Sequence, residues 1–188
     1  MSVAQIVGDD IVYDGWYRLR RLRVRMPCGT EVERHLEDHG SAAAVLPYDP
    51  VARTALIVSM PRAPLLAAGA SPIWEAVAGT LDGREAEDCA RAEAVEEAGV
   101  LLRALEPVAC VWTMPALSSE RLHLFLAPYA ATDRIGKGGG AEGEMENITV
   151  AEIRLSTLRR QLFAGECVDP KLIMLSQALL LRRPELFV

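Results

Sequence analysis

The sequence predicts an α/β protein in which a mixed β-sheet is sandwiched between helices, with an antiparallel strand appendage at the N-terminus. Short apolar runs bounded by Gly and Pro predict the strands. One strong helical segment lies among them, and further helical segments close the chain. Strands that precede and surround the helices in this order are typical of a sheet covered by helices.

A chain of 188 residues fits one domain with a short appendage. Half of the residues are hydrophobic (51%), which is enough for a packed core, but only 5% are aromatic. We therefore expect a core of Ala, Val, Leu and Ile. The predicted division is an N-terminal β appendage over residues 1–40, and a main domain over residues 41–188.

Composition excludes several classes of protein. No apolar run reaches the roughly 18 residues that a membrane span needs, and the N-terminus lacks the pattern of a signal peptide. The four cysteines form no Cys-x-x-Cys pair, so a disulfide framework or zinc site is not expected, and the cytoplasm is the expected compartment. The net charge of −6 argues against nucleic acid as a partner.

The N-terminal 40 residues read as a hairpin. Apolar and basic residues alternate over 21–26, as in a half-buried strand. The apolar positions of 17–19 are out of phase with them, which predicts a bulge near Arg20-Arg21. A turn at 28–30 then leads into a strand at 31–36.

Five arginines gather in this hairpin: Arg18, Arg20, Arg21, Arg23 and Arg25. A solvated strand face is the favoured interpretation. A subunit contact and a site for an anionic ligand are the alternatives.

The main domain begins with two apolar strands joined by a turn at Asp49-Pro50. The strands expected in this domain are 42–47, 54–60, 73–78, 105–112 and 122–128. An Ala- and Pro-rich loop is expected over 61–72 and a Gly-rich acidic loop over 132–147. One or two helices end the chain, with Asp169 as N-cap and Pro170 in the first turn of the last helix.

The chemistry is concentrated on a predicted helix over 85–98, which ends at Gly99. Glu93, Glu96 and Glu97 share one face of this helix, because residues three and four apart are neighbours there. Three like charges within one turn repel one another unless a cation lies among them. Oxygen ligands suit Mg²⁺ or Mn²⁺. A solvated acidic helix face is the alternative.

These residues resemble the Nudix box, a glycine loop followed by a helix with the pattern Arg-Glu-apolar-x-Glu-Glu-x-Gly-apolar. The matching residues are Gly79, Glu93, Ala94, Glu96, Glu97, Gly99 and Val100. The loop is one residue shorter than the usual box. Arg84 or Glu85 takes the place of the first box Glu, depending on where the gap lies. Ala92 replaces the box Arg.

The resemblance extends over most of the chain and is closest to the nucleoside diphosphate sugar branch of the family. GDP-mannose pyrophosphatases and ADP-ribose pyrophosphatases are similar in the same stretches. These stretches are residues 74–79, Pro115 with Glu120 and 123–125, glycines 138–140, and 146–148 before Val150. A homodimer that uses the N-terminal strands is implied by the way dimeric relatives use theirs.

The resemblance implies Mg²⁺-dependent cleavage of a pyrophosphate bond, with Mn²⁺ as a possible substitute. The metal ligands would be Glu93, Glu96, Glu97 and the backbone carbonyl of Ala78. Glu96 and Glu97 would serve catalysis together with Glu146, which matches an acid on a mobile loop. Glu142 and Glu144 are alternatives for that acid, and the three glycines before them predict a flexible loop.

The resemblance also places Arg62 near the substrate phosphates, and Glu75 and Glu120 near the nucleotide or sugar. Ser59 stands where the family usually has a second arginine. His123, on a predicted strand, is interpreted as structural. Trp74, Trp112 and Tyr48 are candidates for the surroundings of the base.

The expected function is hydrolysis of a small nucleoside diphosphate sugar, GDP-mannose or ADP-ribose, to a nucleoside monophosphate and a sugar phosphate. Two alternatives remain. Ala92, Arg84 and the missing arginine motivate a catalytically weak Nudix domain that binds a nucleotide as a sensor. The other alternative is an oligomeric α/β domain whose acidic helix is only a surface.

Overall fold

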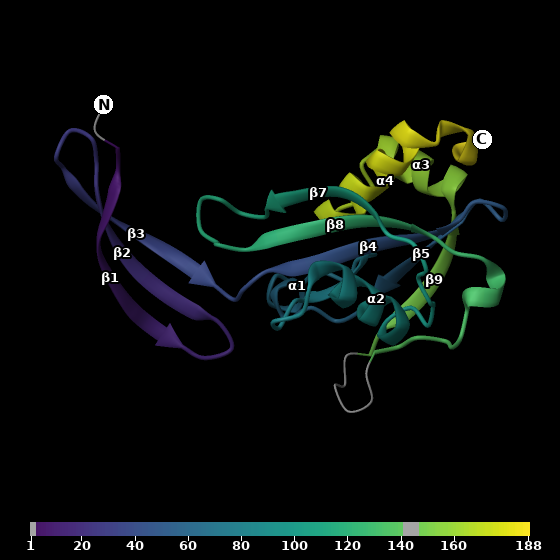
Figure 1. Cartoon of the computed structure of the whole chain (residues 1–188), viewed down its shortest axis with the longest axis horizontal. Coiled ribbons are helices and arrows are strands. Elements are labelled where there is room, and N and C mark those ends of the chain that lie inside the picture. Colours follow the sequence, from purple (N-terminus) through teal and green to yellow (C-terminus); the bar gives the residue numbers. More distant parts are fainter. Residues whose placement is uncertain (1–2, 141–146) are drawn as a thin grey trace. The chain divides into compact units, whose positions relative to one another are not determined.

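The computed structural model describes residues 3–140 and 147–188 (Figure 1). The chain divides into two compact units. One consists of Met1–Ser41 and Val111–Leu122, and the other of Ala42–Cys110 and His123–Val188. The N-terminal unit therefore includes the segment around residues 111–122, which the sequence places within the main domain.

The N-terminal unit contains a three-stranded antiparallel sheet in the order β1-β2-β3. Its strands are β1 (Gln5–Asp14), β2 (Arg18–Arg25) and β3 (Glu31–Asp38). Strands β2 and β3 form the predicted hairpin. Gly29, with φ of 88°, donates its N–H to the carbonyl of Met26 over 2.8 Å in the predicted turn. Strand β1 was not predicted, because it lacks the alternation that marks a half-buried strand.

The predicted bulge in β2 is wrong. Strands β2 and β3 pair without interruption from Arg18 opposite Asp38 to Arg25 opposite Glu31. The register shifts lie instead in β1, one of them between Ile11 and Tyr13. The shift in the apolar alternation of β2 thus accompanies an extra residue in the neighbouring strand β1. Only the strand pairing reveals which strand carries that residue.

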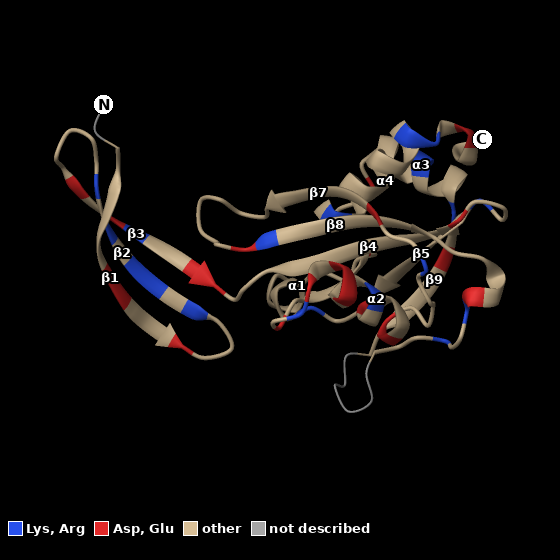
Figure 2. Cartoon of the chain, viewed as in Figure 1, with Lys and Arg blue, Asp and Glu red and all other residues tan. Residues whose placement is uncertain are grey.

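The arginines of β2 lie between acidic residues of the neighbouring strands, as the blue and red segments in Figure 2 show. Arg21 pairs with Asp10 over 3.3 Å, and Arg25 with Glu31 over 2.9 Å. Arg20 pairs with Asp9. Such exposed pairs each contribute little stability, but they balance the positive charge. This arrangement agrees with a solvated strand face.

The second unit is built on a six-stranded sheet in the order β7-β8-β4-β5-β9, with β6 paired to β4. The strands are β4 (Ala42–Asp49), β5 (Thr54–Ser59), β6 (Val77–Thr80), β7 (Glu106–Trp112), β8 (Arg121–Pro128) and β9 (Thr149–Arg154). Strand β9, which pairs along all of β5, was not predicted. Glu75 forms an isolated bridge to Val58, so the chain that leads into β6 also runs beside β5.

Helices cover both faces of this sheet, with α2 on one face and α3 and α4 on the other (Figure 1). The helices are α1 (Ala63–Ala67), α2 (Ala86–Glu96), α3 (Leu155–Ala164) and α4 (Pro170–Arg182). Short 3₁₀ turns cover Ala131–Asp133 and Pro184–Phe187. Helix α1 lies in the segment predicted as a loop. Within the described residues, no helix combines the length and apolar character needed to cross a membrane.

Strand β4 is buried along its whole length, as expected of a strand covered on both faces. Ala43 and Val45 face a core cluster that includes Cys89, Ala90 and Ala94 of α2. These small side chains let the axis of α2 come close to the sheet. The packing therefore brings Glu93 and Glu97 to the backbone of β6.

Candidate active site

Two of the three candidate glutamates, Glu93 and Glu97, lie beside β6, the strand that leads into the glycine loop. Glu97 is 4% exposed, and its Oε2 accepts a hydrogen bond from the backbone N–H of Ala78 over 3.1 Å. In an antiparallel pair, a residue's N–H and C=O point to the same side of the strand. The carbonyl of Ala78 therefore also points away from β4, on the side from which Glu97 approaches.

Glu93 is held against Gly79. A Cβ atom on Gly79 would overlap the Glu93 carboxyl group, so only glycine leaves room for this carboxylate beside β6. On its other side, Glu93 Oε1 accepts a hydrogen bond from Arg84 Nη2 over 3.2 Å. The side chain of Glu93 is only 13% exposed. The carboxylate of Glu93 is thus held between the backbone of Gly79 and the guanidinium of Arg84.

The third glutamate, Glu96, lies on the exposed part of the helix. Within residues 3–140 and 147–188, no three His, Cys, Asp or Glu side chains are gathered closely enough to hold a metal ion. Glu93 is bonded to Arg84, and Glu97 to the backbone of Ala78. The donors nevertheless suit a hard divalent cation in kind, because carboxylate and carbonyl oxygens are what such a cation prefers.

The glycine run at 138–140 packs against the end of α2. Gly139 and Gly140 donate their N–H groups to the carbonyls of Glu97 and Glu96 over 3.0 and 3.1 Å. All three glycines have positive φ, and a Cβ on Gly138 would overlap the Glu97 carbonyl. The run was predicted to make this loop flexible. Its described geometry is that of a cap on the last carbonyls of the acidic helix.

Glu146, Glu142 and Glu144 lie outside the described residues. The predicted catalytic role of Glu146 therefore stays a prediction. The glycine run precedes these acids in the chain and is bonded to the backbone of Glu96 and Glu97.

Arg62 and Glu75, both expected near the substrate, form a bidentate ion pair. Arg62 Nε and Nη2 lie 3.0 and 3.1 Å from the two carboxylate oxygens of Glu75. Lys171 Nζ lies 3.1 Å from Glu75 Oε2 and 2.8 Å from Asp169 Oδ1. Asp169 also caps α4, as predicted, and accepts from the backbone N–H of Ala76 over 3.1 Å.

The four charges balance one another, and Glu75, Lys171 and Asp169 are largely buried, whereas Arg62 is partly exposed. Burial alone would raise the pKa of Glu75, but the hydrogen bonds and charges of Arg62 and Lys171 outweigh it and lower that pKa. Burial would likewise lower the pKa of Lys171, yet Asp169 and Glu75 raise it. Glu75 and Lys171 therefore stay ionised near neutral pH. Lys171 was not identified from the sequence. Its position directly after Asp169 and Pro170 does not indicate that it pairs with the distant Glu75.

Glu120, the other residue expected near the substrate, belongs to the N-terminal unit. Its Oε1 lies 3.3 Å from His39 Nε2. The His39 ring stacks on Trp16 with 5.8 Å between ring centroids. His39 was not identified from the sequence. In the second unit, His123 faces Cys110 with 3.7 Å between Nε2 and Sγ, among strand residues.

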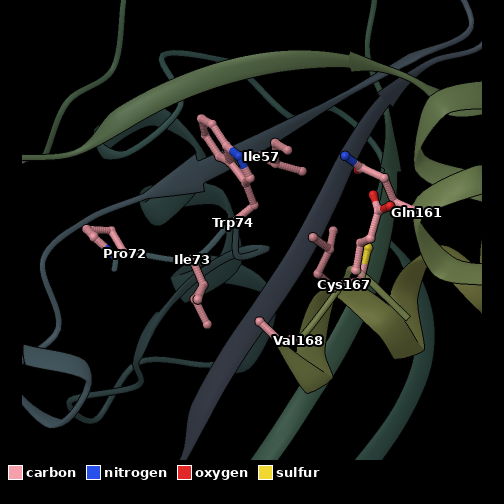
Figure 3. Close-up of a pocket in the computed structure, with 9 residues that line it drawn as sticks. Ile57, Pro72, Ile73, Trp74, Gln161, Cys167 and Val168 are labelled. Carbon is pink, nitrogen blue, oxygen red and sulfur yellow. The ribbon is translucent and has the colours of Figure 1, made fainter. Parts of the chain in front are cut away.

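The structure also contains a cavity of about 220 Å³ (Figure 3). Two of its lining residues, Trp74 and Leu172, are the chain neighbours of Glu75 and Lys171. It is lined by Ile57, Pro72, Ile73, Trp74, Gln161, Glu166, Cys167, Val168 and Leu172. Trp74, one of the candidates for the base surroundings, is 41% exposed here, and Trp112 is 53% exposed. Tyr48 is not suited to that role, because it is 2% exposed and forms part of the core.

Comparison with known proteins gives close relatives over nearly the whole chain. The GDP-mannose pyrophosphatase of Cronobacter sakazakii is 33% identical over 95% of this chain and 95% of its own length. That of Pectobacterium atrosepticum is 32% identical, covering 96% of each. The solved structure of an ADP compounds hydrolase matches with a TM-score of 0.74 at 14% identity, over 97% of both chains, which shows a shared fold. No protein-family model matches the chain.

Proposed function

This chain belongs to the family of the GDP-mannose pyrophosphatases, which are Nudix hydrolases, and we propose that it hydrolyses the pyrophosphate bond of a nucleoside diphosphate sugar. GDP-mannose and ADP-ribose are the first candidate substrates. The products would be a nucleoside monophosphate and a sugar phosphate.

The observation that carries this proposal is the placement of Glu93 and Glu97 against the backbone of β6. Both carboxylates lie within reach of residues 78–79, and the family relationship extends through this region. A diphosphate repels an attacking nucleophile, and carboxylates alone would increase that repulsion. A divalent cation would relieve this repulsion, so we propose that Mg²⁺ or Mn²⁺ binds here.

In the proposed mechanism, Glu93, Glu96, Glu97 and the Ala78 carbonyl would hold the cation. A bound divalent cation would neutralise the phosphates and acidify a bound water. The chain's own contribution is to hold the oxygen ligands at β6 and to position the substrate. Glu146 would assist in moving the proton of the attacking water.

Arg62 is proposed to bind the substrate phosphates. Its side chain is 39% exposed, whereas Glu75 is almost fully buried beneath it. The bidentate pair with Glu75 fixes the plane of the Arg62 guanidinium. A guanidinium fixed in this way loses less conformational entropy when it binds phosphate oxygens. Glu75 would therefore act through Arg62.

A panel of nucleoside diphosphate sugars tests the proposal directly. Each is incubated with the chain in Mg²⁺, in Mn²⁺ or in EDTA, and the nucleoside monophosphate is measured by chromatography. We expect turnover of GDP-mannose or ADP-ribose only when a divalent cation is present. Failure to cleave any sugar in the panel with either cation would reject the proposal.

A nucleotide sensor without turnover is the second candidate, and Ala92 favours it, since the box arginine is missing. Calorimetry separates the two functions. Tight nucleotide binding with no product after hours would identify a sensor, whereas product formation would identify the hydrolase.

A further inference from the structure

The carboxylate face of α2 receives no cation from the helix itself. Ala92 stands immediately before Glu93, at the position where the family motif carries arginine. The neighbouring Arg91 is engaged elsewhere: its Nη1 donates to the carbonyl of Leu102, and its Nη2 lies 3.6 Å from Glu87. Any cation that orients these glutamates must therefore come from outside α2.

Arg84 reaches the cluster from the loop between β6 and α2. Its Nη2 donates to Glu93 Oε1 over 3.2 Å and to the carbonyl of Thr80 over 3.1 Å. Its Nε lies 3.3 Å from the carbonyl of Leu81. The guanidinium is thus fixed by two backbone carbonyls as well as by the carboxylate.

The local turn explains why Arg84 points back to β6. The N–H of Arg84 donates to the carbonyl of Leu81 over 2.8 Å, and the two residues between them, Asp82 and Gly83, have φ of 46° and 82°. Two central residues with positive φ define a tight type I′ turn. The Thr80 hydroxyl also lies 2.8 Å from Asp82 Oδ2. The turn directs the arginine toward the end of the strand on which Glu93 rests.

We propose that Arg84 is a positioning residue, which holds Glu93 for cation binding in place of the arginine that α2 lacks at Ala92. Glu93 is confined between the Gly79 backbone and this guanidinium. A carboxylate has two oxygens that can each accept more than one bond, so its bond to Arg84 is compatible with a metal bond. This inference rests on the proposed function, because it assumes that a divalent cation binds at this cluster.

Coulomb's law and positioning predict opposite effects when Arg84 is neutralised. Removing a nearby positive charge strengthens cation binding if charge is all that Arg84 supplies, or if it competes with the metal for Glu93. Removing a positioning partner weakens binding, by about tenfold to a hundredfold in comparable metal sites. The sign of the change therefore decides between the two roles.

The experiment measures Mn²⁺ binding by calorimetry and electron paramagnetic resonance, without substrate, for the wild type, Arg84→Gln, Arg84→Lys and Arg160→Gln. Arg160 is an exposed arginine of α3, so its substitution changes the net charge equally. We expect about tenfold or weaker Mn²⁺ binding for Arg84→Gln, partial recovery for Arg84→Lys, and no change for Arg160→Gln. Without metal, the melting temperatures of both Arg84 variants should be similar to that of Arg160→Gln.

Hydrolysis of nucleotide sugars is followed in parallel, where kcat should fall in Arg84→Gln and KM should be unchanged. Unaltered or tighter Mn²⁺ binding by Arg84→Gln would overturn the inference, as would a wild type that binds no Mn²⁺. A wild type that binds Mn²⁺ but cleaves no nucleotide sugar would instead reject the proposed function. The two failures are therefore distinguishable.

Discussion

The backbone N–H of Ala78 donates a hydrogen bond to Glu97 Oε2, which ties α2 to β6 over 3.1 Å. This bond places a nearly buried carboxylate beside the carbonyl of Ala78. Glu97 therefore has both a structural partner, Ala78, and a proposed role in metal binding. Substitutions of Glu97 and its neighbours can distinguish the structural role from the metal-binding role.

Glu97→Gln should lose activity and keep the fold. The amide oxygen of Gln can still accept from Ala78, but it is a much weaker ligand for a divalent cation. We expect a fall in kcat of roughly a hundredfold or more, as for loss of other electrostatic groups at reaction centres. Glu87→Gln is the control, because Glu87 lies exposed on the same helix. Steady-state kinetics with equal activity for both variants would remove Glu97 from the site.

Gly79→Ala should displace Glu93. The added methyl group would overlap the Glu93 carboxyl, which is the end of a flexible side chain, so the carboxylate shifts while the backbone stays. We expect kcat to fall about tenfold or more, with a melting temperature close to that of the wild type. Gly136→Ala is the matched control, since the nearest atom to its added carbon would be 4.0 Å away. Full activity of Gly79→Ala would contradict this account of Glu93.

Glu75→Gln should change how stability depends on pH. The pKa of Glu75 is lowered in the folded protein, so its ionised form adds stability above its ordinary pKa of about 4.3. That stability is lost as the pH falls through the lower, folded pKa. The variant should be less stable at pH 7, on the order of 2 kcal/mol, because Arg62 and Lys171 lose hydrogen bonds to a charged partner. Its melting temperature should also fall less steeply below about pH 4.3 than that of the wild type.

The measurement is a series of thermal melts from pH 7 down to pH 3. Glu185→Gln, at an exposed site near the C-terminus, is the control and should follow the wild type. Parallel curves for Glu75→Gln and the wild type across this range would show that Glu75 contributes nothing to acid stability.

The predicted homodimer follows from the N-terminal sheet. Among the described residues of β1, β2 and β3, only Leu22 is buried, and Ile11 and Tyr13 are 57% and 49% exposed. A small sheet without a covered apolar face is marginal on its own. We expect light scattering to give about 41 kDa, twice the 20.5 kDa of one chain.

Ile11→Glu should shift the protein toward the monomer, because it places a charge on the proposed contact surface. Val51→Glu, in the exposed turn after β4, should leave the dimer intact. A wild type that scatters as a monomer at micromolar concentration would refute the dimer.

The sequence by itself determined the features that depend on local spacing. The glutamates of α2 share one face because a helix repeats every 3.6 residues, and Gly99 and Asp169 mark helix ends through backbone chemistry of their own. The mixed α/β fold followed from the order of such local segments. The resemblance to the Nudix box needed only residues within one short stretch.

Only the tertiary structure decided which distant residues meet. Lys171 and Glu75 are 96 residues apart in sequence, and nothing local indicates that they share a charge cluster. Strand β1 and the extra residue in it are defined by pairing with β2. The glycine run caps α2 because its positive φ angles fit against carbonyls that lie far from it in sequence. Local chemistry repeats along the chain and can be read there, whereas contacts between distant segments depend on the path that the whole chain takes.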